Sequence, residues 1–220
     1  RIQIPAYVAQ NYQIKSGDSL WSIAMSRNLP LDTLFLINPN LNPNRLQIGQ
    51  TIQVPLRITW PLVNGKQNYD YEVMMNDIQR LQTIYPFLQV SSIGNSVLNR
   101  SIPEVLIGIG DKRVAYNGSF HANEWITTPT IMTFLNDYAL SLTNQTTIRG
   151  LITSPLYEQT SLSLVPMVNP DGVNLVLNGP PELEPYRSNV IKWNNNSLDF
   201  SGWKANINGV DLNDQFPAEW

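Results

Sequence analysis

The strongest constraint on the fold is an alternation, from residue 69 onward, between short apolar runs and segments of helical periodicity. Helices are expected from Tyr69 to Pro86 and again after Thr127 and Thr128, which are interpreted as N-cap residues with Pro129 near the first turn. Strand-length apolar runs lie at residues 88–93, 105–109, 113–117 and 160–168. Strands that alternate with helices predict an α/β fold, here a mixed, mostly parallel sheet flanked by helices.

The first 55 residues follow a different pattern, in the order strand, helix, helix, strand. Strands are expected at residues 11–15 and 50–54, and short helices at residues 20–26 and 30–37, with a Gly-Asp-Ser turn before the first helix. Arg1–Pro5 resembles Thr51–Pro55, fifty residues later, and a spacing of this size favours a repeated unit.

This small unit resembles a LysM domain. The residues that carry the resemblance are Tyr12, Gly17-Asp18-Ser19-Leu20-Trp21, Ile23-Ala24, Asn38-Pro39 and Leu46-Gln47-Ile48-Gly49-Gln50. LysM domains bind glycans that contain N-acetylglucosamine, in peptidoglycan or chitin. By this resemblance the glycan would lie between two loops, where polar backbone groups and apolar side chains meet the sugar. The residues expected to contact it are Gly17, Asp18, Ser19, Leu20, Asn38 and Leu46.

Two other interpretations of the Gly17–Trp21 segment stay open. Leu20 and Trp21 are more simply core residues, which would define the fold and make no sugar contact. The same segment also spells the nucleophile block of one esterase family, in which Ser19 would need a histidine held by an Asp. Because the single histidine lies about a hundred residues away, the esterase interpretation is the weakest of the three.

Composition excludes several classes of partner. The net charge is −3 and the 14 Lys and Arg residues form no run, so no nucleic-acid partner is expected. The chain has no Cys, which excludes disulfides and thiolate metal ligands. No apolar run approaches the roughly 18 residues of a membrane span, so no membrane partner is expected. The sequence does not indicate the oligomeric state.

The only histidine of the chain lies close to a carboxylate. His121 and Glu124 are three residues apart and directly follow an expected strand, where functional groups collect in α/β sheets. Zinc in hydrolases commonly has three protein ligands and one water, and a His-x-x-Glu pair provides two of them. Such a pair is a weak signal by itself, because a single histidine is more often structural.

Three motifs that occur in order strengthen the zinc interpretation: residues 117–125, 169–172 and 209–213. Together they resemble the zinc carboxypeptidase family. The resemblance implies that His121 and Glu124 bind Zn²⁺ and that Asp211 accepts a hydrogen bond from the far ring nitrogen of His121. On a looser alignment it implies that Lys204 stabilises the oxyanion. Asp171 is expected to form a turn and to have no catalytic role.

Two positions depart from the exopeptidases of that family. At the first position those exopeptidases have an Asn-Arg pair, whose Arg holds the terminal carboxylate of the substrate, and this chain has Asn213-Asp214 instead. At the second position Asn123 replaces a further Arg. An Asp repels a carboxylate and suits an amine or an internal bond. With the LysM unit in front, the chain resembles the bacterial peptidases that cut γ-D-glutamyl–diaminopimelate bonds in peptidoglycan stem peptides. Asn213, Asp214 and Asn123 are therefore the expected substrate-binding residues, with Asp214 facing an amine.

The expected domains are a remnant of an earlier LysM copy at 1–7, a LysM domain at 8–56, a connector at 57–68 and the N-terminal part of a catalytic domain at 69–220. The third zinc ligand of the family, a His, and its general-base Glu have no match after Asn213. We therefore expect a truncated chain that is inactive and holds zinc poorly by itself. The alternative is a non-catalytic LysM protein that binds peptidoglycan or chitin. The resemblance implies a bacterial protein of the cell wall or spore, in a compartment that the sequence does not identify.

Overall fold

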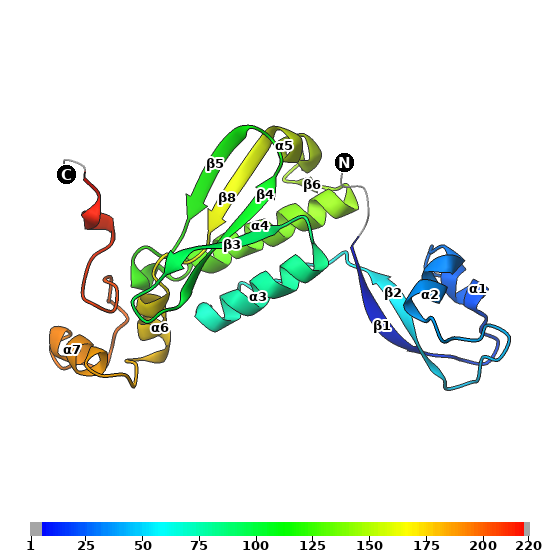
Figure 1. Ribbon diagram of the computed structural model, residues 1–220, viewed down its shortest axis with the longest axis horizontal. Helices are drawn as coiled ribbons and strands as arrows, with labels where there is room; N and C mark the ends of the chain where they lie inside the picture. Colours follow the sequence, from blue (N-terminus) through cyan, green and yellow to red (C-terminus); the bar gives the residue numbers. More distant parts are fainter. Residues whose placement is uncertain (1–5, 218–220) are drawn as a thin grey trace. The chain divides into compact units, whose positions relative to one another are not determined.

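The computed structural model describes residues 6–217, and the contacts within the chain separate two compact units, Arg1–Trp60 and Pro61–Trp220. The first unit consists of β1 (Tyr7–Gln13), α1 (Leu20–Met25), α2 (Leu31–Ile37) and β2 (Thr51–Arg57) (Figure 1). The two strands pair antiparallel along their whole length. This order is the predicted strand, helix, helix, strand. β1 begins inside the predicted remnant at 1–7, and residues 1–5 lie outside the described residues.

The two helices and β2 contribute to the core of the first unit, together with Ile14, which directly follows β1. Its buried members are Ile14, Leu20, Ile23, Ala24, Leu29, Leu34, Ile52 and Val54. Burial of Leu20 confirms its interpretation as a core residue, whereas Trp21 is 63% exposed, so that interpretation is wrong for Trp21. The difference follows from helix geometry, because Ile23 and Ala24, three and four residues after Leu20, lie on the same buried face as Leu20, whereas Trp21 points away from it.

The second unit contains a four-stranded sheet in the order β3-β4-β8-β5. The strands are β3 (Gln89–Asn95), β4 (Ser101–Gly108), β5 (Lys112–Asn117) and β8 (Thr160–Val165). The predicted mixed sheet is confirmed, but its mostly parallel character is wrong for the described residues. β4 pairs antiparallel with both β3 and β8, and β5 pairs parallel with β8. Residues 96–100 alone join β3 to β4, and a connection this short permits a hairpin but no parallel crossover.

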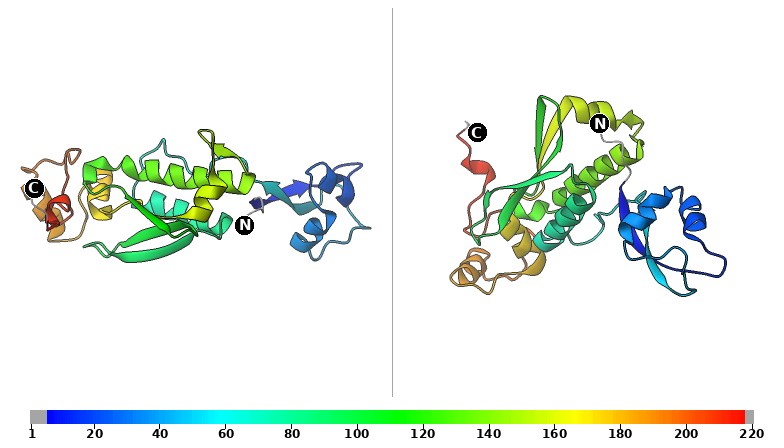
Figure 2. Two further views of the ribbon diagram at one scale, coloured as in Figure 1. Left: turned by 90° about the horizontal axis from the view of Figure 1, so that it is seen from above. Right: turned by 45° about the vertical axis from the view of Figure 1, so that its right-hand side comes forward.

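Helices lie along this sheet, and short elements complete the unit. They are α3 (Tyr71–Ile84), η1 (Ala122–Glu124), α4 (Thr127–Asn144), β6 (Thr147–Ile148), β7 (Leu151–Ile152), α5 (Thr153–Gln159), α6 (Pro170–Asn178), α7 (Tyr186–Trp193) and η2 (Asn213–Gln215). α3 and α4 run side by side (Figure 2). None of the helices within residues 6–217 has both the length and the apolar character needed to span a bilayer.

Burial alternates along the two central strands of the sheet. Val105 and Ile107 of β4 are buried, as are Leu162 and Leu164 of β8, while their sequence neighbours are more exposed. Because side chains of a strand alternate between faces, one face of the sheet carries the core. The other face has polar pairs, such as the hydroxyl of Ser163 that donates to Oε1 of Glu104 at 2.5 Å.

The start of α4 differs from the prediction. Thr127 and Thr128 are the first two residues of the helix, Ile126 is its N-cap, and no side chain caps it. The two hydroxyls make other hydrogen bonds: Thr127 donates to the carbonyl of Glu124 at 2.8 Å, and Thr128 to the carbonyl of Pro166 at 2.7 Å. They therefore connect the helix to the loops that follow β5 and β8.

Candidate functional site

The candidate site lies where the parallel strands β5 and β8 end. Both strands deliver their carboxyl ends to the same edge of the sheet, and the two loops that follow stay paired. Gly118 N–H donates to the carbonyl of Val165 at 3.0 Å, Val168 N–H to that of Gly118 at 2.9 Å, and Asn169 N–H to that of Ser119 at 3.0 Å. Residues that are about fifty positions apart in sequence are thus brought together at the expected edge of an α/β sheet.

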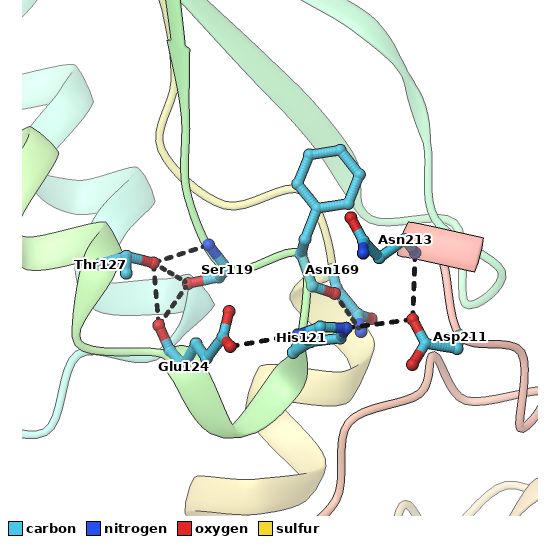
Figure 3. Close-up of polar contacts among 8 residues, drawn as sticks. Ser119, His121, Glu124, Thr127, Asn169, Asp211 and Asn213 are labelled. Carbon is cyan, nitrogen blue, oxygen red and sulfur yellow. Dashed lines mark hydrogen bonds and ion pairs between the residues drawn. The ribbon is translucent and has the colours of Figure 1, made fainter. Parts of the chain in front are cut away.

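A buried left-handed residue turns the first of these loops. Ser119 has φ 53°, a conformation that costs a non-glycine residue about 1 kcal/mol or more. Its N–H donates to Oγ1 of Thr127 at 2.7 Å (Figure 3). Its hydroxyl lies 2.7 Å from Oγ1 of Thr128. These hydrogen bonds stabilise the turn, and they explain why the two threonines do not cap α4.

His121 lies between two carboxylates. The 3₁₀ turn η1 brings Glu124 back beside the ring, with Oε1 at 3.1 Å from Nδ1 of His121. On the other side, Oδ1 of Asp211 lies 3.1 Å from Nε2 (Figure 3). The His121 side chain is 18% exposed and that of Glu124 52% exposed, so the imidazole is mostly covered while the Glu124 carboxylate is open to solvent. The predicted contact between Asp211 and the far ring nitrogen is present.

The two carboxylates affect the ionisation of the imidazole. The hydrogen bond with Glu124 is the largest cause that raises the pKa of His121 above its ordinary value of 6.5, and the charges of Asp211 and Glu124 add to it. Burial acts in the opposite direction and is outweighed. The charged imidazolium satisfies both carboxylates, because it carries an N–H on each ring nitrogen.

The same geometry fits a metal ion. When Asp211 holds the proton on Nε2, the Nδ1 lone pair points toward Oε1 of Glu124, and two acceptors this close require a proton or a cation between them. An imidazole nitrogen and a carboxylate oxygen are both ordinary zinc ligands. Within residues 6–217, no group of three or more His, Cys, Asp and Glu side chains is placed to hold a metal. The described residues therefore offer two ligands.

The loop that carries Asp211 is bound to η1 through its backbone. Ala122 N–H donates to the carbonyl of Lys204 at 3.0 Å, and Asn123 N–H to that of Trp203 at 2.9 Å. The Lys204 side chain is exposed and lines a pocket of about 520 Å³ together with Asp211. Neither zinc-ligand candidate lines this pocket, so the assignment of Lys204 to an oxyanion stays a prediction.

The three predicted substrate-binding residues have different environments. Asn213 and Asp214 belong to η2; the N–H of Asn213 donates to Oδ1 of Asp211 at 3.0 Å, and Asp214 is exposed. Oδ1 of Asn123 is buried and has no hydrogen-bond partner among the described residues. Its burial gives no support to a substrate contact through that oxygen, whereas Asp214 is accessible to a ligand.

Asp171 corrects the sequence interpretation, in which it is a turn former. Its side chain is 2% exposed, and Oδ1 accepts from the Arg100 guanidinium at 2.7 Å and from the Ser96 hydroxyl at 3.0 Å. Its Oδ2 accepts from Leu98 N–H at 2.9 Å. Asp171 thus anchors α6 to the β3–β4 turn. No local signal predicts this pair, because its members are 71 residues apart.

Asn169 belongs to the 169–172 motif, but the sequence assigns it no role of its own. It is the N-cap of α6, and its Oδ1 accepts from Gly172 N–H at 3.0 Å. The Asn-Pro-Asp-Gly sequence contains the signal for that cap, an Asn followed by a Pro at the first helical position. Its contacts with the loops of the site are not visible in the sequence.

In the first unit, several predicted glycan-binding side chains serve the fold. Oδ2 of Asp18 accepts from the Lys15 N–H at 2.7 Å and from the Tyr12 hydroxyl at 2.8 Å. Both hydrogen bonds lower the pKa of Asp18, and the bond from Lys15 has the larger effect. Ser19 caps α1 in a reciprocal arrangement with Ser22. The esterase interpretation of Ser19 therefore receives no support from its surroundings.

Asn38 and Leu46 also contribute to the structure of the first unit. The Asn38 amide donates to the carbonyls of Leu34 and Gln53 at 2.8 and 2.7 Å and accepts from Gln53 N–H at 2.8 Å. Leu46 packs against the core, and Leu20 belongs to it. The side chains of Leu20 and Asn38 thus serve the fold, and contact of these two residues with a glycan stays a prediction. Gly17, with φ 85°, shapes the turn before α1.

Comparison with known proteins finds a family match in each of the two units. Residues 74–220 match the family described as zinc carboxypeptidase, and residues 12–55 match the LysM domain. The crystal structure of a LysM domain from a Volvox carteri chitinase is 43% identical, with a TM-score of 0.22, over 22% of this chain and 100% of that domain.

Two relatives match most of this chain. Gamma-D-glutamyl-L-diamino acid endopeptidase 1 of Lysinibacillus sphaericus is 70% identical over 94% of this chain. Uncharacterized protein YqgT of Bacillus subtilis (strain 168) is 42% identical over 78% of it. The chain spans 65% of the length of the first and 46% of that of the second. With a family match over two thirds of its length, the chain belongs to the zinc carboxypeptidase family and carries a LysM domain ahead of the family region.

Proposed function

We propose that the protein is a zinc-dependent peptidase that cuts peptidoglycan stem peptides at the γ-D-glutamyl–diaminopimelate bond. The observation that carries the proposal is the His121 imidazole, with Glu124 at one ring nitrogen and Asp211 at the other. The substrate follows from the relative at 70% identity, which is named a γ-D-glutamyl-L-diamino acid endopeptidase, and from the acidic Asp214.

In this proposal each residue of the site has one task. His121 and Glu124 bind zinc through Nδ1 and a carboxylate oxygen. Asp211 accepts the Nε2 proton, which fixes the tautomer and makes the imidazole a better ligand. A zinc ion held by these two residues would supply the means to acidify a water molecule and to polarise the scissile carbonyl. Lys204 is proposed to stabilise the oxyanion, and Asn213 and Asp214 to bind the substrate.

The LysM domain is proposed to hold the protein on peptidoglycan glycan strands. A weak glycan-binding module raises the local concentration of the stem peptides that the catalytic unit acts on. Because Asp18, Ser19 and Asn38 make internal hydrogen bonds with their side chains, the proposed glycan contacts come from backbone groups of the two loops and from accessible apolar side chains. Trp21, which is exposed in α1 beside the turn that precedes this helix, is accessible for such contact.

The function is tested with this chain in its natural polypeptide. We expect release of diaminopimelate-containing peptide from a γ-D-glutamyl–diaminopimelate substrate, loss of that activity with a zinc chelator, and recovery on addition of Zn²⁺. Retention of peptidoglycan binding without any hydrolysis would instead identify a non-catalytic glycan-binding protein.

Asp214 tests the specificity. Replacing it by Arg should lower kcat/KM for a diaminopimelate-containing peptide at least about tenfold, because one charge reversal replaces attraction to an amine by repulsion. The matched control is Asp199→Arg, a reversal at an exposed Asp outside the site, which should leave kcat/KM unchanged. Equal kinetics for Asp214→Arg and the unmodified enzyme would contradict the role of Asp214.

Zinc binding should depend on pH in a defined direction. The pKa of His121 is raised, so the imidazolium persists to a higher pH than in an ordinary histidine, and Nδ1 must lose its proton before it binds a metal. Zinc affinity should therefore fall as the pH drops through this raised pKa, by about tenfold per pH unit once the imidazolium dominates. Titrations with a zinc-sensitive dye between pH 5.5 and 8, from about one unit below to about one and a half units above the pKa of an ordinary histidine, measure this dependence. A flat profile would contradict it.

A further inference from the structure

Asn169 is the residue at which three segments of the site meet. The residue is 2% exposed, and each of its polar groups has a partner. Its N–H donates to the carbonyl of Ser119, and its Oδ1 accepts from Gly172 N–H. The two hydrogens of its side-chain amide go to different loops, to the carbonyl of Phe120 at 3.3 Å and to that of Ala205 at 3.1 Å. Figure 3 shows the amide beside the His121 loop.

Both recipients of the amide adjoin the metal site. Phe120 directly precedes His121. Ala205 completes a series of three consecutive carbonyls, 203–205, that accept hydrogen bonds from Asn123 N–H, Ala122 N–H and the Asn169 amide. These three bonds bind the loop that leads to Asp211 against the turn that carries the zinc ligands.

The backbone beneath the amide leaves little room for adjustment. A Cβ atom at Gly172 would lie 2.6 Å from Nδ2 of Asn169 and 2.8 Å from Cβ of Ala122. Only glycine at position 172 therefore allows α6 to lie this close to η1. This close contact fixes the distance between Asn169 and the His121 loop.

We propose that Asn169 is a positioning residue for the metal site. Its amide sets the separation of the His121 loop and the Asp211 loop, and through it the direction in which Nδ1 of His121 points. This inference rests on the proposed function, in that it takes His121 and Glu124 as zinc ligands. None of the hydrogen bonds of Asn169 within the described residues reaches the side chain of His121 or Glu124, so its effect passes through backbone groups.

The first test is the Asn169→Asp variant. Aspartate has the same shape and is an equally good N-cap, so it keeps the hydrogen bond from Gly172, but it has no N–H for the carbonyls of Phe120 and Ala205. We expect the dissociation constant for Zn²⁺, measured with a zinc-sensitive dye, to rise about tenfold, as for loss of other outer-shell partners. Asn169→Ser, which caps without a charge, should give the same rise and serves if the Asp variant does not fold.

The matched control is Asn136→Asp. Asn136 is fully buried in α4, where its Oδ1 accepts from Leu62 N–H at 2.9 Å, away from the site. Its replacement removes the same amide group from the interior and should leave the zinc dissociation constant of the folded protein unchanged. Equal rises in the two variants would reduce the role of Asn169 to general stability and overturn the inference.

A double-mutant cycle with Asp211→Asn separates positioning from general stability. If Asn169 acts by holding the Asp211 loop at His121, its replacement should weaken zinc binding only about threefold or less once Asp211 has lost its charge, because the two sites share one pathway. A full tenfold effect in both backgrounds would overturn the inference. Zinc binding that survives His121→Ala would contradict the proposed function instead, whatever the Asn169 variants show.

Discussion

Replacing His121 by Ala should abolish specific zinc binding, with a loss of affinity on the order of a hundredfold or more, above that expected for an outer-shell partner. His121 is the only histidine of the chain, and the chain has no cysteine, so the chain offers one imidazole nitrogen and no thiolate to zinc. Its removal leaves Glu124, whose exposed carboxylate alone holds a hydrated ion no better than other surface carboxylates do. The dissociation constant for Zn²⁺ measures the effect.

Glu124→Gln provides the companion experiment, since it removes the charge and keeps the shape. We expect zinc affinity to fall about tenfold or more. Glu182→Gln is the matched control, because Glu182 is another exposed glutamate. It lies away from the site and forms an ion pair of 3.0 Å with Arg187. Zinc affinity that is equal in His121→Ala and the unmodified chain, or equally reduced by Glu182→Gln, would contradict the assignment of the two ligands.

Replacing Asp171 by Ala should destabilise the second unit by about 3 kcal/mol, at the low end for loss of one partner of a buried ion pair. The variant leaves the Arg100 guanidinium, the Ser96 hydroxyl and the Leu98 N–H without their acceptor. Arg100 retains partial access to water, which keeps the loss below the upper limit. Urea unfolding, followed through NMR signals of residues in the second unit, measures this value apart from the LysM unit.

Glu182→Ala is the control for that measurement. It removes the carboxylate from the ion pair with Arg187, whose Glu182 side chain is almost fully exposed, and exposed pairs contribute from zero to about 1 kcal/mol. We expect no measurable change in the free energy of unfolding. If Asp171→Ala is destabilised as little as Glu182→Ala, Asp171 does not anchor α6 to the β3–β4 turn.

Local signals in the sequence predict much of the fold. The 3.6-residue period that begins near Tyr69 gives α3, and the Gly-Asp-Ser turn gives the start of α1, because both depend on residues that are neighbours in the chain. Local signals predict strand direction less well. Which strands pair, and in which direction, depends on connections between distant segments, and the short β3–β4 connection was the one local indication of a hairpin.

The site divides in the same way. His121 and Glu124 are three residues apart, and their proximity follows from one helical turn. The partner of His121, Asp211, lies 90 residues away, and it was predicted from a family resemblance and not from any pattern of spacing. Asn169 was missed because its amide bonds two loops that only the tertiary fold brings together. Trp21 was misassigned because an apolar residue beside a buried one need not share its face.

The proposed metal site depends on the two ring nitrogens of His121, and ¹⁵N NMR of the imidazole tests it most directly. With a single histidine in the chain, the spectrum contains one pair of ring-nitrogen signals, without ambiguity of assignment to a residue. On addition of Zn²⁺ we predict that the Nδ1 signal moves to the range of a metal-bound nitrogen, while Nε2 keeps the proton that it donates to Asp211. A metal bound at Nε2, or ring signals that do not respond to zinc, would contradict the account.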